Sequence, residues 1–243
     1  MSLTQYITRK LHNLTHPVLG EIWMLHRVVE RRNNDPKQQE LEVTPQYLEQ
    51  TINEYQHQGY RFVSIDEAVE ILQKTHLSPF TFHNSPFICL TFDDGYHDNY
   101  TTALPLLKRL NVPFAVYITT GFIDNQLPMW WYPDQQLGLS LDELIALDHE
   151  PLCTIGAHTI SHPRLDTLTA SKQREEILDS KATLEKWLNH PIQHFSYPHG
   201  AYNNDTLAIV KSADFLSALC AWGGTVRCGD NPLLLHRIEL RQQ

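Results

Sequence analysis

Residues 87–118, FICLTFDDGYHDNYTTALPLLKRLNVPFAVYI, decide the fold of this chain. Two apolar runs in this stretch, 87–92 and 113–118, have the length and the aromatic and β-branched content of buried strands. Between them, residues 103–110 carry apolar side chains at helical spacing. A strand, a helix and a second strand in this order predict two parallel strands joined by a right-handed crossover.

The same alternation of short apolar runs and helical patterns extends along most of the chain. Further strands are predicted at 22–25, 60–65, 153–157, 194–196, 215–219 and 233–235. Helices are predicted to begin after Thr44, Asp66 and Ser140, and to lie within 169–189 and 204–213. About seven strand–helix units in 243 residues favour one α/β domain over 1–243, an imperfect βα-barrel rather than an open sheet. Within it, residues 1–20 are predicted to include an N-terminal docking helix, because apolar residues recur there at helical spacing.

The charge balance excludes several classes of protein. The chain has 19 Lys and Arg against 28 Asp and Glu, a formal charge of −9, which makes it a poor partner for nucleic acid. It contains no apolar stretch long enough to span a membrane, and its first residues lack the apolar core of a secretory signal. We therefore expect a cytoplasmic protein without stable membrane insertion.

Polar residues follow several of the predicted strands directly. In a βα-barrel the carboxyl ends of the strands share one face, and this face carries the reacting groups. The residues in question are His26, Asp93 and Asp94, His158, the run from Tyr197 to His199, and His236. The pattern predicts that a single site is built from these strand ends.

Two of these segments have the composition of a metal centre. Asp93 and Asp94 are adjacent carboxylates, which repel each other unless a cation or a shared proton is present. His158 and His162 are four residues apart, a spacing that suits one metal ion. Either segment alone is also typical of an ordinary loop, with a helix-capping aspartate in the first case. Together they favour a metal held by two imidazoles and one carboxylate, with positions left open for water and substrate.

Four motifs then resemble one known family. TFDDGY (91–96), HTISHP (158–163), SYPHG (196–200) and LLLHRI (233–238) have the order and approximate spacing of the polysaccharide deacetylases, the NodB-homology or carbohydrate esterase 4 group. The resemblance covers the chain from about residue 26 to residue 238. It implies a distorted (β/α)7 barrel of NodB type, which agrees with the strand count reached from the pattern alone.

The resemblance also implies roles for individual residues. Asp93 matches the family's catalytic base, while Asp94, His158 and His162 match its metal ligands, with Zn²⁺ as the expected ion. His236 matches the histidine that serves as general acid.

The segment Tyr197, Pro198, His199 matches the part of the family's site that lines the groove and helps to bind the oxyanion. Two further residues are candidates for substrate contact: His26, at a strand end, and Trp131, in a long aromatic loop over 121–136 whose rings suit stacking on sugars. Structural alternatives remain for both, a strand-end histidine and a packed aromatic residue.

The chain departs from the family pattern at two positions. Many members carry an arginine that holds the catalytic base, where this chain has Ser196, and a tyrosine where it has His199. Loss of the arginine removes a positive charge that would keep Asp93 ionised. At the last motif a second interpretation is also open, in which His236 only ends a strand and Arg237 is the functional group.

The expected function is therefore metal-dependent hydrolysis of N-acetyl or O-acetyl groups on a polysaccharide or oligosaccharide that contains amino sugars. One alternative is a metal-dependent hydrolase of another non-peptide C–N bond on the same scaffold. The other is a carbohydrate-binding protein with impaired catalysis, for which Ser196 would be the mark.

Overall fold

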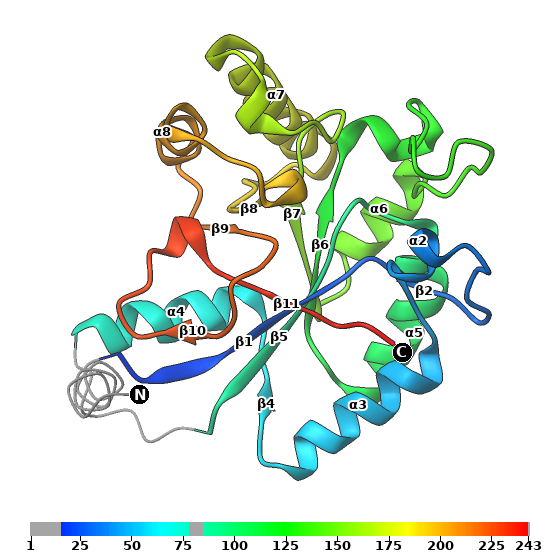
Figure 1. The fold of residues 1–243 in the computed structure, drawn as a ribbon, viewed down its shortest axis with the longest axis vertical. Helices are drawn as coiled ribbons and strands as arrows, with labels where there is room; N and C mark the ends of the chain where they lie inside the picture. Colours follow the sequence, from blue (N-terminus) through cyan, green and yellow to red (C-terminus); the bar gives the residue numbers. More distant parts are fainter. Residues whose placement is uncertain (1–15, 78–84, 243) are drawn as a thin grey trace.

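The computed structural model describes residues 16–77 and 85–242, and its main sheet consists mostly of parallel strands (Figure 1). Neighbouring strands follow the order β10-β1-β5-β6-β7-β8-β9. In addition, β11 pairs with the C-terminal part of β1, and β4 pairs with the start of β5. Their bounds are β1 Val18–Leu25, β4 Arg61–Phe62, β5 Phe87–Phe92, β6 Phe114–Ile118, β7 Cys153–Ala157, β8 His194–Ser196, β9 Ser217–Leu219, β10 Val226–Arg227 and β11 Ile238–Glu239. The short strands β2 Arg27–Val28 and β3 Glu42–Val43 form a separate parallel pair.

The parallel strands close into a distorted barrel. On one side of the opening, Leu219 of β9 forms an isolated parallel bridge with Leu235. On the other side, β11 pairs in parallel with β1 through Trp23↔Ile238 and Met24↔Glu239. The series β1, β5, β6, β7, β8, β9 and β11 therefore returns to its start, which confirms the expected (β/α)7 class. Because few pairs join β9 to β1, the barrel is irregular at this seam.

Helices surround the barrel. Their bounds are α2 Pro36–Gln39, α3 Pro45–His57, α4 Ile65–Leu77, α5 Leu104–Leu110, α6 Leu141–Asp148, α7 Ala170–Leu188 and α8 Asn204–Ser212. Short π or 3₁₀ turns occur at η1 Asn99–Ala103, η2 Thr120–Asn125, η3 Leu165–Thr167, η4 Pro198–Gly200 and η5 Pro232–Leu234. Thr44 caps α3 and Ser140 caps α6 with a complete capping box, as the sequence predicts.

Side chains alternate between two cores, as the period of a β-strand requires. In β5, Ile88, Leu90 and Phe92 point outward into the core between strands and helices, whereas Phe87 and Cys89 point into the barrel. Residues of α4 pack against the inner cluster, so this helix contributes to the barrel's interior. The inner positions are the ones that lead to the site described below.

Three local expectations need correction. Of the strand expected at 233–235, Leu233 and Leu234 belong to a 3₁₀ turn, because Pro232 lacks an amide hydrogen and the Asn231 side chain accepts the amide of Leu233 instead; Leu235 alone makes a strand bridge. The helix α4 is capped by Ser64, whose Oγ accepts the amide of Glu67, and not by Asp66. The docking helix predicted within 1–20 does not include positions 18–20, which belong to β1. Positions 1–15 of that prediction lie outside the described residues.

Within the described part of the chain, no helix combines the length and apolar character needed to cross a bilayer.

Candidate metal centre and active site

The alternation along the strands brings distant residues to one end of the barrel. Continuing the inward positions of β5 past Thr91 leads to Asp93, and continuing those of β1 past Met24 leads to His26. The same rule leads from Gly156 in β7 to His158, and from Leu235 to Arg237. These four residues therefore lie at the same end of the barrel, where the sequence predicts a site.

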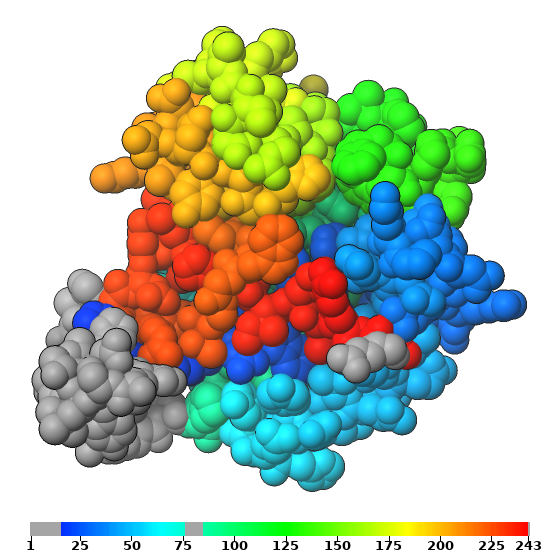
Figure 2. Space-filling view, viewed as in Figure 1, coloured from blue at the N-terminus to red at the C-terminus, as the bar shows by residue number. Residues whose placement is uncertain are grey.

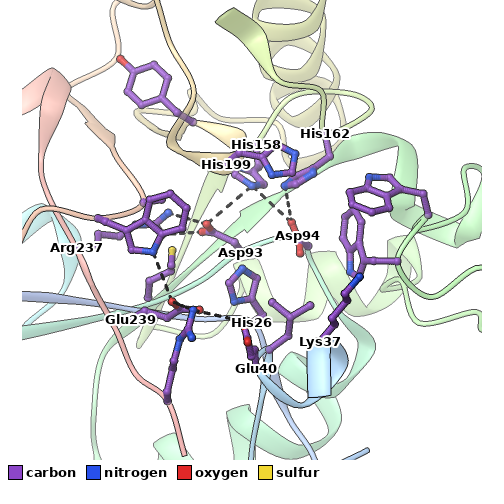
Figure 3. A pocket seen from close by; sticks show the side chains of 18 residues that line it. His26, Lys37, Glu40, Asp93, Asp94, His158, His162, His199, Arg237 and Glu239 are labelled. Atoms are coloured by element: carbon purple, nitrogen blue, oxygen red, sulfur yellow. Dashed lines mark hydrogen bonds and ion pairs between the residues drawn. The ribbon is translucent and has the colours of Figure 1, made fainter. Parts of the chain in front are cut away.

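A cavity of about 390 Å³ opens at this end of the barrel, and Figure 2 shows a hollow near the centre of this face. Residues from eight separate stretches of the chain line it. They include Met24, His26, Lys37, Glu40, Leu41, Asp93, Asp94, Trp130, Trp131, His158, His162, Tyr197, His199, Ala221, Trp222, Arg237, Glu239 and Arg241 (Figure 3).

The two adjacent aspartates diverge because the backbone turns sharply between them. Asp94 and Gly95 both have left-handed φ values, +76° and +83°. Asp tolerates this region better than most residues, and Gly adopts it without strain. The turn gives the two carboxylates different partners, although both are almost fully buried, with exposed fractions of 3% for Asp93 and 2% for Asp94.

The loop that follows β7 carries both histidines in a compact, non-helical form. Thr159 and His162 have φ values of +68° and +59°, and the amide of His162 donates to Thr159 Oγ1 at 3.1 Å. Glu176 of α7 fixes the loop from outside, because its carboxylate accepts the amides of Ile160 and Ser161 at 2.8 and 2.9 Å. No local motif in the sequence indicates this role of Glu176.

Asp94, His158 and His162 direct one ligand atom each to a common point. The Nε2 atoms of His158 and His162 lie 3.5 and 3.3 Å from Asp94 Oδ1. The Nδ1 atom of His158 lies 2.7 Å from the carbonyl oxygen of Ser196, which can only accept a hydrogen bond. The proton of this imidazole is therefore on Nδ1, and its Nε2 has a free lone pair.

Electrostatics supports the same assignment. Burial lowers the pKa of His158 to about 4 and that of His162 to about 3, so both imidazoles are neutral at pH 7. Burial also raises the pKa of Asp94, and its Oδ1 has no hydrogen-bond partner among the described residues. The free lone pair of His158 Nε2 thus faces an oxygen of Asp94 that has no hydrogen-bond donor among the described residues, an arrangement that a cation would stabilise.

These three residues fit a tetrahedral divalent ion. Two ligands about 2.1 Å from such an ion are about 3.4 Å apart, close to the observed separations of 3.3 and 3.5 Å. All three ligand atoms lie within 4.8 Å of one another and belong to buried residues. Asp94, His158 and His162 are accordingly the candidate metal ligands.

Asp93 has a different environment, dominated by Arg237. The guanidinium binds the carboxylate through two parallel hydrogen bonds, Nη1–Oδ1 at 2.8 Å and Nη2–Oδ2 at 2.7 Å. Burial alone would raise the pKa of Asp93, but the charge and hydrogen bonds of Arg237 outweigh it and hold this pKa well below its usual value. Asp93 is therefore an anion at neutral pH.

Ser196 lies between these two groups. Its Oγ accepts from Arg237 Nη2 at 2.9 Å and donates to Asp93 Oδ2 at 3.3 Å. The expectation that Ser196 leaves Asp93 without a positive charge is thus wrong, because Arg237 supplies the charge from the segment before β11. The small serine side chain leaves room for a guanidinium that reaches Asp93 from another strand.

His236 does not line the cavity. Its Nδ1 lies 2.7 Å from the carbonyl oxygen of Trp222. Its ring packs closely on Gly223, the residue after Trp222, where an added Cβ would lie 2.0 Å from Nδ1. The alternation that points Leu235 and Arg237 inward turns His236 away. The structure therefore contradicts the placement expected for a general acid and agrees with the second interpretation of this motif.

The Tyr197–His199 segment is placed only partly as expected. The amide of Tyr197 donates to Leu219 O and its hydroxyl to Leu233 O, so neither is available to a substrate. Pro198 is buried and does not line the cavity. His199, with a φ of +58°, does line it, and its amide has no hydrogen-bond partner among the described residues.

His26 and Trp131 both line the cavity, from opposite sides of the aspartates. In Figure 3 His26 lies on one side of Asp93 and Asp94, and His158, His162 and His199 lie on the other. The Trp131 ring centroid is 4.9 Å from that of His162. The adjacent Trp130 is 66% exposed, which leaves its ring free at the rim.

Comparison with known proteins gives consistent matches. A family model described as polysaccharide deacetylase matches residues 81–218. The peptidoglycan-N-acetylglucosamine deacetylase of Bacillus cereus is 28% identical over 150 residues, 62% of this chain and 63% of that protein. The chitooligosaccharide deacetylase of Azorhizobium caulinodans is 27% identical over 129 residues, 53% of this chain and 55% of that protein. The aligned part covers only 51% to 63% of the length of the curated relatives.

Among solved structures, the Streptococcus pyogenes deacetylase PplD in complex with acetate superposes with a TM-score of 0.78 at 25% identity. The superposition covers 92% of this chain and 93% of that one. The shared fold thus extends over nearly the whole described chain.

Proposed function

Because the chain belongs to the polysaccharide deacetylase family, we propose that it hydrolyses the N-acetyl group of an amino sugar in a saccharide, with a divalent metal ion, Zn²⁺, as cofactor. The observation that carries this proposal is the separation of two buried aspartates into two roles. Asp94 joins His158 and His162 with an unpartnered oxygen, while Asp93 is kept ionised by Arg237 beside them.

Asp94, His158 and His162 would hold the ion. A Zn²⁺ ion bound there acidifies water and polarises the acetyl carbonyl. Zn²⁺ is preferred over Mg²⁺ or Ca²⁺ because two of the three ligands are imidazoles, which those harder cations seldom use.

Asp93 acts as the proton acceptor for the attacking water. A carboxylate offers about four lone-pair sites. Arg237 occupies one site on each oxygen, and Ser196 occupies the second site on Oδ2. One site on Oδ1 remains to receive a proton, and it belongs to a group that Arg237 keeps charged at neutral pH.

Two other groups complete the reaction. The free amide of His199 is the hydrogen-bond donor for negative charge on the acetyl oxygen, because the nearby amides of Tyr197, Gly200 and Ala201 already donate to backbone carbonyls. His26 is the proton donor to the leaving amine, since it faces the aspartates from the wall opposite the histidine ligands.

The rim favours a saccharide over a small amide. Trp130 and Trp222 are 66% and 61% exposed, and both line this cavity. Exposed aromatic rings provide flat apolar surfaces on which sugar rings pack. The case for an impaired carbohydrate-binding protein loses its main support, because Arg237 supplies the charge that Ser196 lacks.

The test is acetate release from N-acetylglucosamine oligomers by the Asp93→Asn variant and the wild type, each depleted of metal and then reloaded with Zn²⁺. We expect the variant to bind one Zn²⁺ with little change in affinity while its rate falls by about 10²–10⁴-fold. Asp179→Asn makes the same chemical change at an exposed position of α7 and is the matched control. Full activity of Asp93→Asn, or an unchanged rate in chelated enzyme, would refute the proposal.

A further inference from the structure

A buried ion cluster lies beside the cavity without lining it. Arg27, which is 9% exposed, donates from Nε to Asp98 at 2.8 Å and from Nη1 to Glu42 at 3.0 Å. Both carboxylates are themselves buried, at 8% and 2% exposed. The three residues come from β2, the turn before η1, and β3.

Two tyrosine rings that contact each other edge-on pack against the guanidinium of Arg27. Its central carbon lies 5.3 Å from the ring centroid of Tyr96 and 5.0 Å from that of Tyr132. The Tyr132 hydroxyl donates to the same Glu42 oxygen that Arg27 contacts, at 3.0 Å. The guanidinium is therefore held along its edge by two carboxylates and packed against two neighbouring rings, whose centroids are 6.2 Å apart, an arrangement that a lysine cannot reproduce.

Such a cluster is poorly explained by stability alone. Desolvation of a buried ion cluster can cancel its Coulomb energy, and apolar replacements of similar volume are often as stable. A cluster of this kind fixes geometry more than it adds stability, so the segments that it joins indicate what it positions.

One of these segments carries Trp131. The ring of Tyr96 packs on Arg27, and its hydroxyl accepts a hydrogen bond from the indole N–H of Trp131 at 2.6 Å. Tyr132, whose ring packs edge-on against that of Tyr96 beside Arg27, is the next residue along the chain. The Trp131 ring in turn contacts the ring of His162, so Arg27 reaches one side of the cavity through two tyrosines.

The other segment carries His26, the residue before Arg27. Asp98, one of the two carboxylates that bind Arg27, also accepts a hydrogen bond from the amide of Val28, at Oδ1 over 3.0 Å. Asn99, the next residue, donates from its side chain to the carbonyl oxygen of His26 at 2.8 Å. The backbone on both sides of Arg27 is thus held by one turn, which itself follows Asp93 and Asp94.

We infer that Arg27 is a positioning residue that fixes His26 and Trp131 relative to the two aspartates. This inference rests on the proposed function for its kinetic consequence, but not for its structural one. Arg27 acts through Tyr96, Tyr132 and Asp98, and does not itself contact the substrate.

The test compares Arg27→Met and Arg27→Lys with wild type by two readouts. The first is solvent exchange of the Trp131 indole N–H, measured by NMR and assigned with Trp131→Phe. In wild type its hydrogen bond to Tyr96 slows exchange, and we expect exchange at least tenfold faster in both variants. The second is acetate release, where a displacement of about 1 Å costs on the order of 10²-fold. We expect the loss in kcat to exceed the change in KM.

Two controls separate positioning from loss of stability. Arg109→Met removes an exposed arginine that makes two hydrogen bonds to one carboxylate, that of Glu49, and Ile177→Val destabilises the outer core away from the cavity. We expect both to retain wild-type kcat and indole exchange, as measured well below their unfolding temperatures. If Arg27→Met does not fold, Tyr132→Phe tests the same chain of contacts, because it keeps the ring and removes only the hydroxyl, which donates to Glu42 and to the carbonyl oxygen of Gln38.

Unchanged indole exchange in a folded Arg27 or Tyr132 variant would overturn the inference. So would a kcat loss that Ile177→Val reproduces. If wild type releases no acetate from any saccharide, the proposed function fails, and the exchange measurement still decides whether Arg27 positions Trp131.

Discussion

Replacing Arg237 by Met would expose the dependence of Asp93 on its counter-ion. The substitution keeps much of the side-chain volume but removes both hydrogen bonds to a carboxylate that is 3% exposed. Breaking a buried ion pair by removing one partner typically costs about 3–5 kcal/mol of unfolding free energy. We expect a loss in this range at pH 7, as measured by urea unfolding.

The cost should depend on pH in a defined direction. In wild type the pKa of Asp93 lies below its unfolded value of about 3.9, so the pair stabilises the fold above that pH and loses this effect as pH falls through the folded pKa. Arg237→Met removes the group that contributes most to lowering the pKa of Asp93, so burial raises that pKa above the unfolded value. Between pH 4 and pH 8 the variant is then least affected at pH 4, and its deficit grows with pH by about 1.4 kcal/mol for each unit by which its folded pKa exceeds the unfolded value.

Activity should report the same change. A raised pKa of Asp93 shifts the acidic limb of the acetate-release profile to higher pH, because the base must lose a proton before it can act. Adding Ser196→Arg to Arg237→Met returns a guanidinium to the same carboxylate from β8, and we expect it to restore part of both losses. The reasoning would be refuted by a stability deficit that is constant from pH 4 to pH 8 together with an unshifted acidic limb.

Three further outcomes are expected. Removing the metal with a chelator should lower the unfolding temperature, because an ion present at about 100 times its Kd adds about 2.7 kcal/mol, and Asp94→Asn should abolish that difference in calorimetry. His236→Ala should lower kcat by less than about threefold, whereas a general acid is worth about 10²–10⁴-fold, so a steady-state rate constant distinguishes the two roles. Gly156→Ala should destabilise the fold by about 1–3 kcal/mol in urea titration, because its Cβ would lie 2.5 Å from the Tyr117 ring inside the barrel; an unchanged midpoint would contradict this packing.

Local patterns in the sequence were sufficient for most of the elements. The strand at 87–92 and the helix caps at Thr44 and Ser140 follow from short-range rules, apolar runs and side chains that accept helix amides. The grouping of Asp94, His158 and His162 was also predictable, because strand ends in a barrel meet on one face.

Long-range geometry limited the rest. Whether His236 or Arg237 points inward depends on the register of Leu235 against Leu219, which a short and irregular segment does not reveal. The ion pair between Arg237 and Asp93 likewise joins residues from distant parts of the chain, so no motif around Ser196 indicates it. Buried ion clusters such as that of Arg27 also arise from contacts between segments, and single-sequence patterns do not contain them.

The seam that closes the barrel determines when, during synthesis, Asp93 receives its counter-ion. Arg237 follows Asp93 by 144 residues and is held in a segment whose strand β11 makes only two pairs with β1. At ribosomal rates of about 5–20 residues per second, the aspartate is synthesised about 7–30 s before its counter-ion. The nascent chain therefore has an unfinished candidate site during that interval. In the mature molecule Arg237 also donates to the carbonyl oxygen of Cys220 and to Ser196 Oγ, so its withdrawal requires the seam to open at Cys220 as well as at β11.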